Sequence, residues 1–321
     1  MNRDAATCLL LLAAVSATSA LAQNYPNRPI KLVVASSPGG SSDILGRLTA
    51  AKMTDGLKQQ VVVENRAGAS GVIGVDVVAK APPDGYTLVI TQTSLAINPS
   101  MIKKMPYEAM RDLAPISEIV TAPNVLVVHP SVPAKTVKEL IAVAKSKPGR
   151  INVGSPGVGT SPHLSAELFK YMAGAAMPQV LYKGSGQSMI GLLSGEIESA
   201  FPTMPTVIQY VKDGRVRALG VTTLKRVQAM PNVPSIAEAG LPGYESTQWF
   251  GILAPAGTPR AIIDRLNQEL KRVLSLPEIK DRLASEGTEV VASSPEDFAK
   301  HIKSETEKWA KVIKAAGIKP E

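Results

Sequence analysis

Two short loops rich in glycine and hydroxyl side chains carry the residues best suited to binding chemistry in this sequence. Each follows an apolar, strand-like run and precedes a helix-like segment. Such a loop places backbone N–H groups and hydroxyls at the positive end of a helix, where they can hold an anion. Two of them predict two halves that close on one small anionic ligand. The candidate ligand-binding residues are Ser37, Gly39, Gly40, Ser41 and Asp43 in the first loop and Ser155, Gly157, Gly159, Thr160 and Ser161 in the second.

The first loop by itself also fits a plain strand-to-helix turn, in which Asp43 caps the following helix. The second loop lacks the lysine of a P-loop, and Pro162 stands where a dinucleotide fingerprint needs its third glycine. Nucleotide binding is therefore disfavoured. We expect small-carboxylate binding through backbone N–H groups and through the hydroxyls of Thr160 and Ser161.

Catalytic chemistry has little support in the sequence. The chain has 3 histidines, and none shows metal-ligand spacing, so we predict no metal site, no cofactor and no enzyme activity. No Gly-x-Ser-x-Gly elbow stands in the expected surroundings. His163, beside the second loop, could contact a ligand or pack in the core. Lys183, in another strand-to-helix loop, could pair with a ligand carboxylate.

Strand-like and helix-like segments alternate along most of the chain, which predicts an α/β fold with mainly parallel sheets and flanking helices. The succession of strand, Gly/Ser loop and helix occurs once early and once in the middle of the chain. This recurrence fits two similar lobes with a cleft where the strand ends face each other. The expected strands are Ile30–Val34, Val61–Glu64, Tyr86–Ile90, Val125–Val128, Ile151–Val153, Val180–Tyr182 and Val216–Val221.

Several helix starts and two buried helix faces can also be predicted. Thr136 and Glu139 form a capping box. Ser161, Thr258 and Ser294 each precede a proline and are expected N-caps. Two apolar stripes near the end of the chain should pack against a sheet. Their members are Ile262, Ile263, Leu266, Leu270 and Val273 in one helix and Phe298, Ile302, Trp309 and Ile313 in the next.

Residues 1–22 have the features of a secretory signal peptide. Arg3 precedes the short apolar core Leu9–Val15, and Ala20-Leu21-Ala22 fits a small-x-small cleavage site. The apolar run is too short to span a bilayer. Cleavage after Ala22 would remove Cys8, the only cysteine of the chain, so no disulfide is expected.

Length and charge limit the classes of function further. A chain of 321 residues usually forms about two domains. The formal net charge of +8 serves solubility or attracts anionic ligands. Nucleic-acid binding is disfavoured, because the basic residues are scattered and only 4% of residues are aromatic.

A series of short motifs follows the predicted signal peptide and continues along nearly the whole remaining chain. The motifs are Tyr25-Pro26-Asn27-Arg28-Pro29-Ile30, Pro38-Gly39-Gly40-x-x-Asp43, Val63-Glu64-Asn65-Arg66-x-Gly68-Ala69-x-Gly71, Pro83-Asp84-Gly85-Tyr86-Thr87-Leu88, Ala96-Ile97-Asn98-Pro99, Gly159-Thr160-Ser161-x-His163-Leu164, Tyr182-Lys183-Gly184, Val233-Pro234-Ser235-Ile236-Ala237-Glu238-Ala239-Gly240 and Ala254-Pro255-Ala256-Gly257-Thr258-Pro259. In this order they resemble the substrate-binding proteins of tripartite tricarboxylate transporters, of the Bordetella uptake gene (Bug) type.

The resemblance implies a periplasmic protein with a two-lobed, type II-like periplasmic-binding-protein fold that closes around its ligand by a hinge. It implies a first lobe from residues 23–123 plus 247–321 and a second from 124–246. Loops 37–43 and 155–161 would hold a ligand carboxylate, partly through bridging waters, and Ser94 and Thr203 would line the same cleft. The closed form would deliver the ligand to a permease of one large and one small integral membrane subunit. A monomer is the default for such receptors.

The sequence departs from the family pattern on the side of the cleft that sets ligand specificity. Ser36 and Ser37 replace an aromatic residue and an alanine that many relatives have. Pro202 and Thr203 stand where many relatives have Asp-Asn, which makes an amino-acid ligand less favoured. Leu95 replaces a commonly polar residue and could favour a ligand with an apolar or aromatic middle.

Two other functions stay open at this point. The same receptor could serve mainly as a ligand sensor for a membrane kinase, which the sequence does not separate from transport. A secreted hydrolase is the third class, and the scarcity of histidine and of paired carboxylates counts against it.

Overall fold

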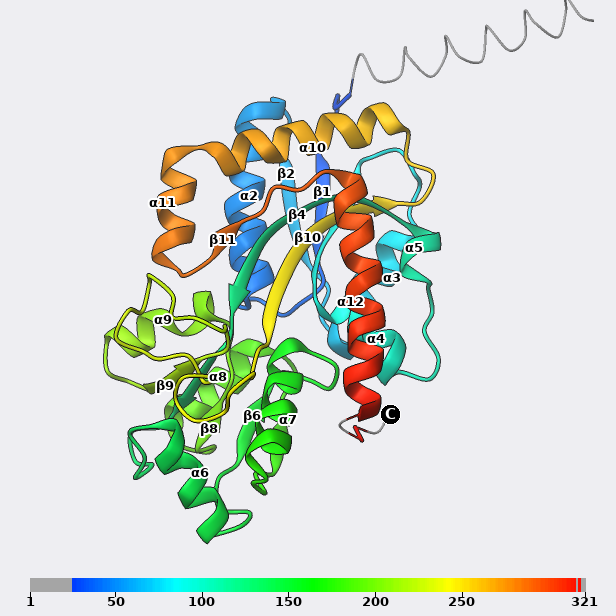
Figure 1. Ribbon diagram of the computed structural model, residues 1–321. Coiled ribbons are helices and arrows are strands. Elements are labelled where there is room, and N and C mark those ends of the chain that lie inside the picture. Colours follow the sequence, from blue (N-terminus) through cyan, green and yellow to red (C-terminus); the bar gives the residue numbers. More distant parts are fainter. Residues whose placement is uncertain (1–24, 316, 319–321) are drawn as a thin grey trace, which may run out of the picture.

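The computed structural model describes residues 25–315 and 317–318, so the predicted signal peptide lies outside the described residues. Figure 1 shows two lobes, each built on a β-sheet with helices on its faces. The expected α/β class and two-lobed fold are thereby confirmed. Among the described residues, no helix combines the length and the apolar character that a membrane span requires.

The upper lobe in Figure 1 contains a six-stranded sheet in the order β11-β4-β10-β3-β1-β2. Its strands are β1 (Ile30–Val34), β2 (Val61–Asn65), β3 (Thr87–Gln92), β4 (Leu113–Pro123), β10 (Thr247–Pro255) and β11 (Glu289–Val290). The helical segments of this lobe are α2 (Ser41–Leu57), the 3-10 turn η1 (Ala69–Gly71), α3 (Val72–Ala79), α4 (Ser94–Met101), α5 (Ala109–Asp112), α10 (Arg260–Ser275), α11 (Pro277–Ser285) and α12 (Pro295–Ala315).

The lower lobe contains a five-stranded sheet in the order β7-β6-β8-β5-β9. Its strands are β5 (Val125–Val128), β6 (Val153–Ser155), β7 (Gln179–Leu181), β8 (Ser199–Ala200) and β9 (Arg217–Val221). Its helices are α6 (Val137–Ser146), α7 (Ser161–Ala173), α8 (Ser185–Ser194) and α9 (Met204–Lys212). Each expected strand is present, with ends that differ by up to two residues.

Both sheets are mixed, where the sequence analysis expected mainly parallel pairing. In the first sheet β1 pairs in parallel with β2 and β3, whereas β10 pairs antiparallel with β3 and β4. In the second sheet β5 pairs antiparallel with both of its neighbours. The reason lies in the crossings between lobes. The long strand β4 carries the chain towards the second lobe and β10 carries it back, so the two must run in opposite directions.

Thr222 forms hydrogen bonds with both chain segments that connect the lobes, at Asn124 and at Ser246. Its backbone N–H donates to the carbonyl of Asn124 at 3.0 Å, and its carbonyl accepts from the backbone N–H of Ser246 at 2.9 Å. The N–H of Asn124 donates to the Thr222 hydroxyl at 2.8 Å. The strands that leave and re-enter the first lobe are therefore held side by side at one point.

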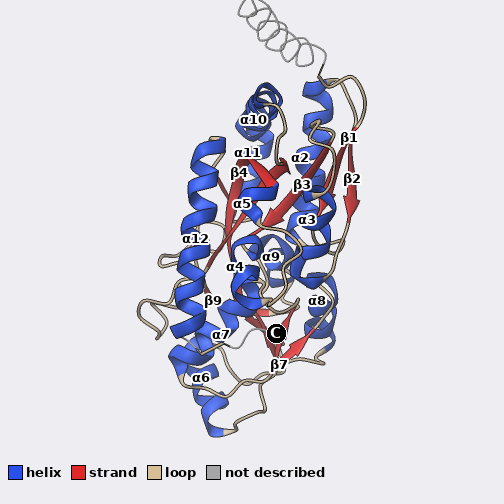
Figure 2. Cartoon of the chain, turned by 90° about the vertical axis from the view of Figure 1, so that its right-hand side faces the viewer, coloured by secondary structure: helices blue, strands red, loops and turns tan. Residues whose placement is uncertain are grey.

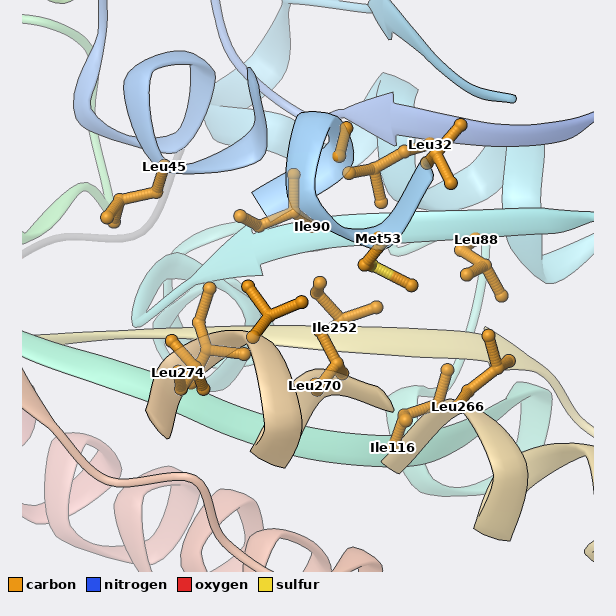
Figure 3. Packing of buried hydrophobic residues seen from close by; sticks show 14 of the residues in the cluster. Leu32, Leu45, Met53, Leu88, Ile90, Ile116, Ile252, Leu266, Leu270 and Leu274 are labelled. Carbon is orange, nitrogen blue, oxygen red and sulfur yellow. The ribbon is translucent and has the colours of Figure 1, made fainter. Parts of the chain in front are cut away.

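The first lobe has a buried cluster between its sheet and helices α2 and α10, and a second cluster that includes Phe298 and Ile302 of α12. Figure 3 shows Leu45 and Met53 of α2 and Leu266 and Leu270 of α10 among the strand residues that they cover. Both predicted apolar stripes are fully buried, which confirms that these faces pack inward. Figure 2 shows α12 running along the flank of the molecule past both lobes.

The predicted helix caps are confirmed in part. The hydroxyls of Thr136 and Ser294 accept N–H groups three residues on, at 3.1 Å each. The N-cap of α7 is Thr160, one residue before the expected Ser161, since Thr160 accepts the N–H of His163. The prediction for Thr258 was wrong, because its hydroxyl instead donates to the carbonyl of Pro255 at 2.7 Å.

Candidate functional site

The two lobes enclose a cavity of about 430 Å³. Its walls come from the loops that follow β1 and β2, the loops that follow β6, β7 and β8, and the facing ends of β3 and β10. In open α/β sheets, loops beyond the carboxyl ends of the strands are where ligands bind. The topology therefore directs both lobes' loops at one enclosed space.

Four helix N-termini converge on this cavity. The N-cap residues of α2, α7, α8 and α9 are Gly40, Thr160, Gly184 and Thr203, and all four line it. Only the Thr160 side chain caps its own helix. The first N–H groups of a helix have no acceptor within it and carry the positive end of its dipole. The four helix N-termini therefore favour the binding of an anion in the cavity.

The charged groups of the wall agree with this preference. Lys183 is the one charged residue among those that line the cavity, and it forms no ion pair with another described residue. No carboxylate belongs to the lining. The hydroxyl of Ser41 is buried, with no hydrogen-bond partner among the described residues. It can therefore serve a ligand oxygen at the N-terminus of α2.

The first predicted loop divides into residues that face the cavity and residues that hold the loop in shape. Ser37, Gly40 and Ser41 line the cavity, whereas Gly39 and Asp43 do not. The Asp43 carboxylate accepts from the Gly39 N–H at 3.0 Å. Burial raises the pKa of Asp43, but the bonds from Arg47, Gly39 and Asn65 outweigh it and hold the pKa below its usual value. Asp43 therefore acts as a fixed anion that closes the turn.

The second predicted loop divides in the same way. Gly157 and Thr160 line the cavity. Ser155 is buried, with its hydroxyl against the backbone of Gly157. The Ser161 hydroxyl accepts from the amide of Asn124 at 2.8 Å, at the first crossing between lobes. Gly159 lies outside the lining, with a positive φ of 75°.

Of the remaining predicted residues, Lys183 and Thr203 line the cavity and Ser94 does not. Ser94 is buried in the first turn of α4. His163 is also buried outside the lining; burial lowers its pKa, and its Nδ1 has no partner among the described residues. No cluster of metal-ligating side chains occurs within residues 25–315.

The structure adds polar wall residues that the sequence analysis did not single out. Gln92 lies at the end of β3 and Gln248 near the start of β10, and their side chains meet at 2.7 Å. Gln92 follows a predicted strand, so its position at a strand end was a usable signal. Gln248 belongs to a strand that was not predicted, and nothing in its neighbourhood marked it.

The lobes touch on both sides of the cavity. On one side the Ser70 hydroxyl donates to the carbonyl of Val158. On the other side, a Cβ placed on Gly186 of α8 would lie 3.3 Å from the carbonyl oxygen of Pro38 in the first loop. Loops of opposite lobes therefore approach each other beside the cavity.

Comparisons with known proteins agree with this arrangement. Residues 45–318 match the family described as tripartite tricarboxylate transporter family receptor. Protein BugT of Bordetella pertussis is 37% identical over 300 residues, which cover 93% of this chain and 92% of BugT. The structure of R. palustris Rpa4515 with adipate has a TM-score of 0.91 at 37% identity, covering 93% of this chain and 100% of the other. MatC from Rhodopseudomonas palustris with bound malate has a TM-score of 0.85 at 28% identity, covering 90% and 100%.

Proposed function

This chain belongs to the tripartite tricarboxylate transporter receptor family, and on that premise we propose that it captures a small dicarboxylate between its two lobes by hinge closure. The family consists of periplasmic solute-binding receptors, not enzymes. Two similar structures hold adipate and malate, which are both dicarboxylates. We extend this ligand class to the present chain.

The observation that carries the proposal is the convergence of four helix N-termini on a cavity whose lining contains no carboxylate. A carboxylate oxygen accepts hydrogen bonds from N–H and O–H donors, and a bond to a charged group contributes about 1.5–3 kcal/mol. A lining without an acidic side chain offers no carboxylate that could form an ion pair with the ammonium group of an amino acid. The cavity therefore suits a ligand that carries only negative charge.

The predicted site residues take two kinds of role in this proposal. Those in the lining contact the ligand, partly through water, and those behind it fix the loops. The contact residues are Ser37, Gly40, Ser41, Gly157, Thr160, Lys183 and Thr203, and the supporting residues are Gly39, Asp43, Ser94, Ser155, Gly159 and Ser161. Lys183 would pair with the second carboxylate of the ligand.

Closure would take place at the two crossings near Asn124 and Ser246. We place the first lobe in residues 23–123 plus 247–321 and the second in 124–246. The Thr222 hydrogen bonds join the crossings, so a rotation there would move the second sheet as a unit. A ligand that contacts both lobes stabilises the closed form and excludes water.

The closed form would then present the ligand to a permease of one large and one small integral subunit, after export by a cleaved signal peptide at residues 1–22. Uptake of labelled adipate or malate by cells with and without the receptor gene tests this step. Equal uptake in both strains, despite binding by the purified receptor, would remove the transport role and favour sensing.

Binding is tested with the monomeric fraction of the protein from residue 23 onward, freed of co-purified ligand by unfolding and refolding. We expect malate, succinate or adipate to raise the melting temperature, while glutamate and nucleotides do not. A ligand at about 100 times its Kd adds about 2.7 kcal/mol to the stability. No shift with any dicarboxylate in the refolded protein would contradict the proposal.

A matched pair of variants tests the role of Thr160. The Thr160 hydroxyl donates to the Gly157 carbonyl at 2.7 Å and caps α7, so Thr160→Ala should release the lining loop, weaken binding at least tenfold and cost about 1 kcal/mol in stability. Thr160→Ser keeps the hydroxyl and should retain both. Unchanged affinity in Thr160→Ala would show that this hydroxyl does not hold the loop in its binding shape.

A further inference from the structure

Four polar side chains form one continuous hydrogen-bonded chain along the inner wall of the cavity. The Ser42 hydroxyl donates to Gln92 Oε1 at 3.0 Å, and Gln248 Nε2 donates to the same oxygen at 2.7 Å. The Thr203 hydroxyl donates to Gln248 Oε1 at 3.2 Å. The chain begins in α2 of the first lobe and ends at the N-cap of α9 in the second lobe. It therefore connects the two lobes directly behind the ligand space.

Counting donors and acceptors shows which way the Gln92 amide faces. An amide oxygen has two lone pairs, and both are used at Gln92 by Ser42 and Gln248. The amide nitrogen of Gln92 has no acceptor among the described residues, and Gln92 lines the cavity. Its two N–H donors are consequently available to a ligand.

The charge of the ligand selects this orientation. Turning both amides by 180° would keep the chain of bonds but would direct the Gln92 oxygen at the bound molecule. With an anion in the cavity, that arrangement would place the Gln92 oxygen against a ligand oxygen, and both atoms are acceptors. In the orientation that the structure has, the Gln92 amide nitrogen is the donor to the ligand oxygen. The bond between Gln92 and Gln248 couples the orientations of the two amides, and a negatively charged ligand favours the orientation in which Gln92 donates.

We propose that Gln92 is a specificity-determining residue, which donates to a ligand oxygen, and that Gln248 is the positioning residue that holds it and links it to the second lobe through Thr203. This inference rests on the proposed function and deepens it. It predicts that a carboxylate of the ligand lies beside Gln92 and accepts from its amide. Neither glutamine belongs to the two glycine-rich loops.

The test compares variants that keep the size of the side chain. Gln92→Met lacks the donor, and Gln92→Glu keeps the acceptors for Ser42 and Gln248 but replaces the donor with a negative charge. Calorimetric titration with malate and adipate should show binding at least tenfold weaker for Gln92→Met and about a hundredfold weaker for Gln92→Glu. Glutamate binding should fall less in Gln92→Glu, so the ratio of malate to glutamate affinity changes. Gln209→Met, in an exposed part of α9, is the control with unchanged affinity.

The positioning role of Gln248 is tested by a double-mutant cycle. Gln248→Met should weaken binding about tenfold, and the Gln92→Met/Gln248→Met double variant should bind no more weakly than Gln92→Met alone. Additive losses would overturn the positioning role. If the wild type binds malate or adipate and Gln92→Met binds equally well, the inference fails while the proposed function stands. If the wild type binds neither probe, the proposed function fails and the inference fails with it.

Discussion

Closure can be tested at a glycine that faces the opposite lobe but does not line the cavity. Gly186 is the second residue of α8, and a Cβ on it would lie 3.3 Å from the Pro38 carbonyl oxygen across the cleft. This separation is tight for a carbon–oxygen contact, so the two lobes must move apart slightly. Gly186→Ala therefore penalises the closed form, while the open form has no neighbour there to meet.

The same substitution should stabilise the ligand-free protein. Alanine is favoured over glycine within a helix by about 1 kcal/mol, which in a chain of this size raises the melting temperature by roughly 2 °C. A penalty of about 1 kcal/mol on the closed form, at the low end of overpacking costs, weakens binding about fivefold. Gly186→Val adds two methyl groups compared with Gly186→Ala and should weaken binding at least tenfold more than Gly186→Ala does.

The assay is a pair of measurements on each variant: thermal unfolding without ligand and calorimetric titration with malate or adipate. Opposite signs, with higher stability and lower affinity, identify an obstacle to closure and exclude a general loss of structure. Ser194→Ala, at the exposed C-terminal end of α8, is the control, since it raises helix propensity without facing the other lobe. Wild-type affinity in both Gly186 variants would refute the closing contact between α8 and the first loop.

Three further predictions concern single side chains. Ser70→Ala removes the hydroxyl that donates to the Val158 carbonyl across the cleft, so titration should show about fivefold weaker binding. Ser70→Gly should bind as weakly as Ser70→Ala. It should unfold at a higher temperature, because glycine relieves the strain of the positive φ of 53° at this position. Lys183→Met should weaken adipate binding about tenfold and leave hexanoate, a monocarboxylate of the same length, unchanged. Burial and the nearby Glu305 raise the pKa of Glu118 from 4.5 to about 7, so its contribution to stability is present below pH 4.5 and is lost as the pH rises to 7. Urea unfolding at pH 5 and pH 8 should show that Glu118→Gln avoids this loss, which is roughly 3 kcal/mol at most; an identical pH dependence in variant and wild type would contradict the raised pKa.

The sequence predicted the strands of the fold better than their directions. Short, mostly apolar runs such as Ile30–Val34, which is buried except at Lys31, are recognisable as strands. The strand Leu113–Pro123 carries Pro115, Pro123 and a buried Glu118, which break its apolar pattern. The strand Thr247–Pro255 has an apolar run, but Gly251 interrupts it, and glycine is depleted in strands. Because these two strands were not predicted, the antiparallel pairs of the first sheet were not predicted either, and we expected mainly parallel pairing.

Within the candidate site, the sequence located the loops but did not tell which hydroxyls face the ligand space. Ser41 and Ser161 are both serines at the first residue of a helix that follows a glycine-rich loop. The Ser41 hydroxyl is left without a partner at the cavity, whereas that of Ser161 is engaged by Asn124. The difference depends on a neighbour 37 residues away, which local composition does not reveal.

The distribution of donors over the two lobes bears on how binding produces closure. One of the four converging helix N-termini, that of α2, belongs to the six-stranded sheet's lobe, and the other three, α7, α8 and α9, belong to the lobe of the five-stranded sheet. A ligand shifts an equilibrium between open and closed forms only by the difference in its affinity for the two. A ligand held by the three N-termini of one lobe alone would bind without closing the cleft. The contacts that the first lobe makes, among them those of α2 and Gln92, therefore determine closure, because they add to the binding energy only when the lobes meet.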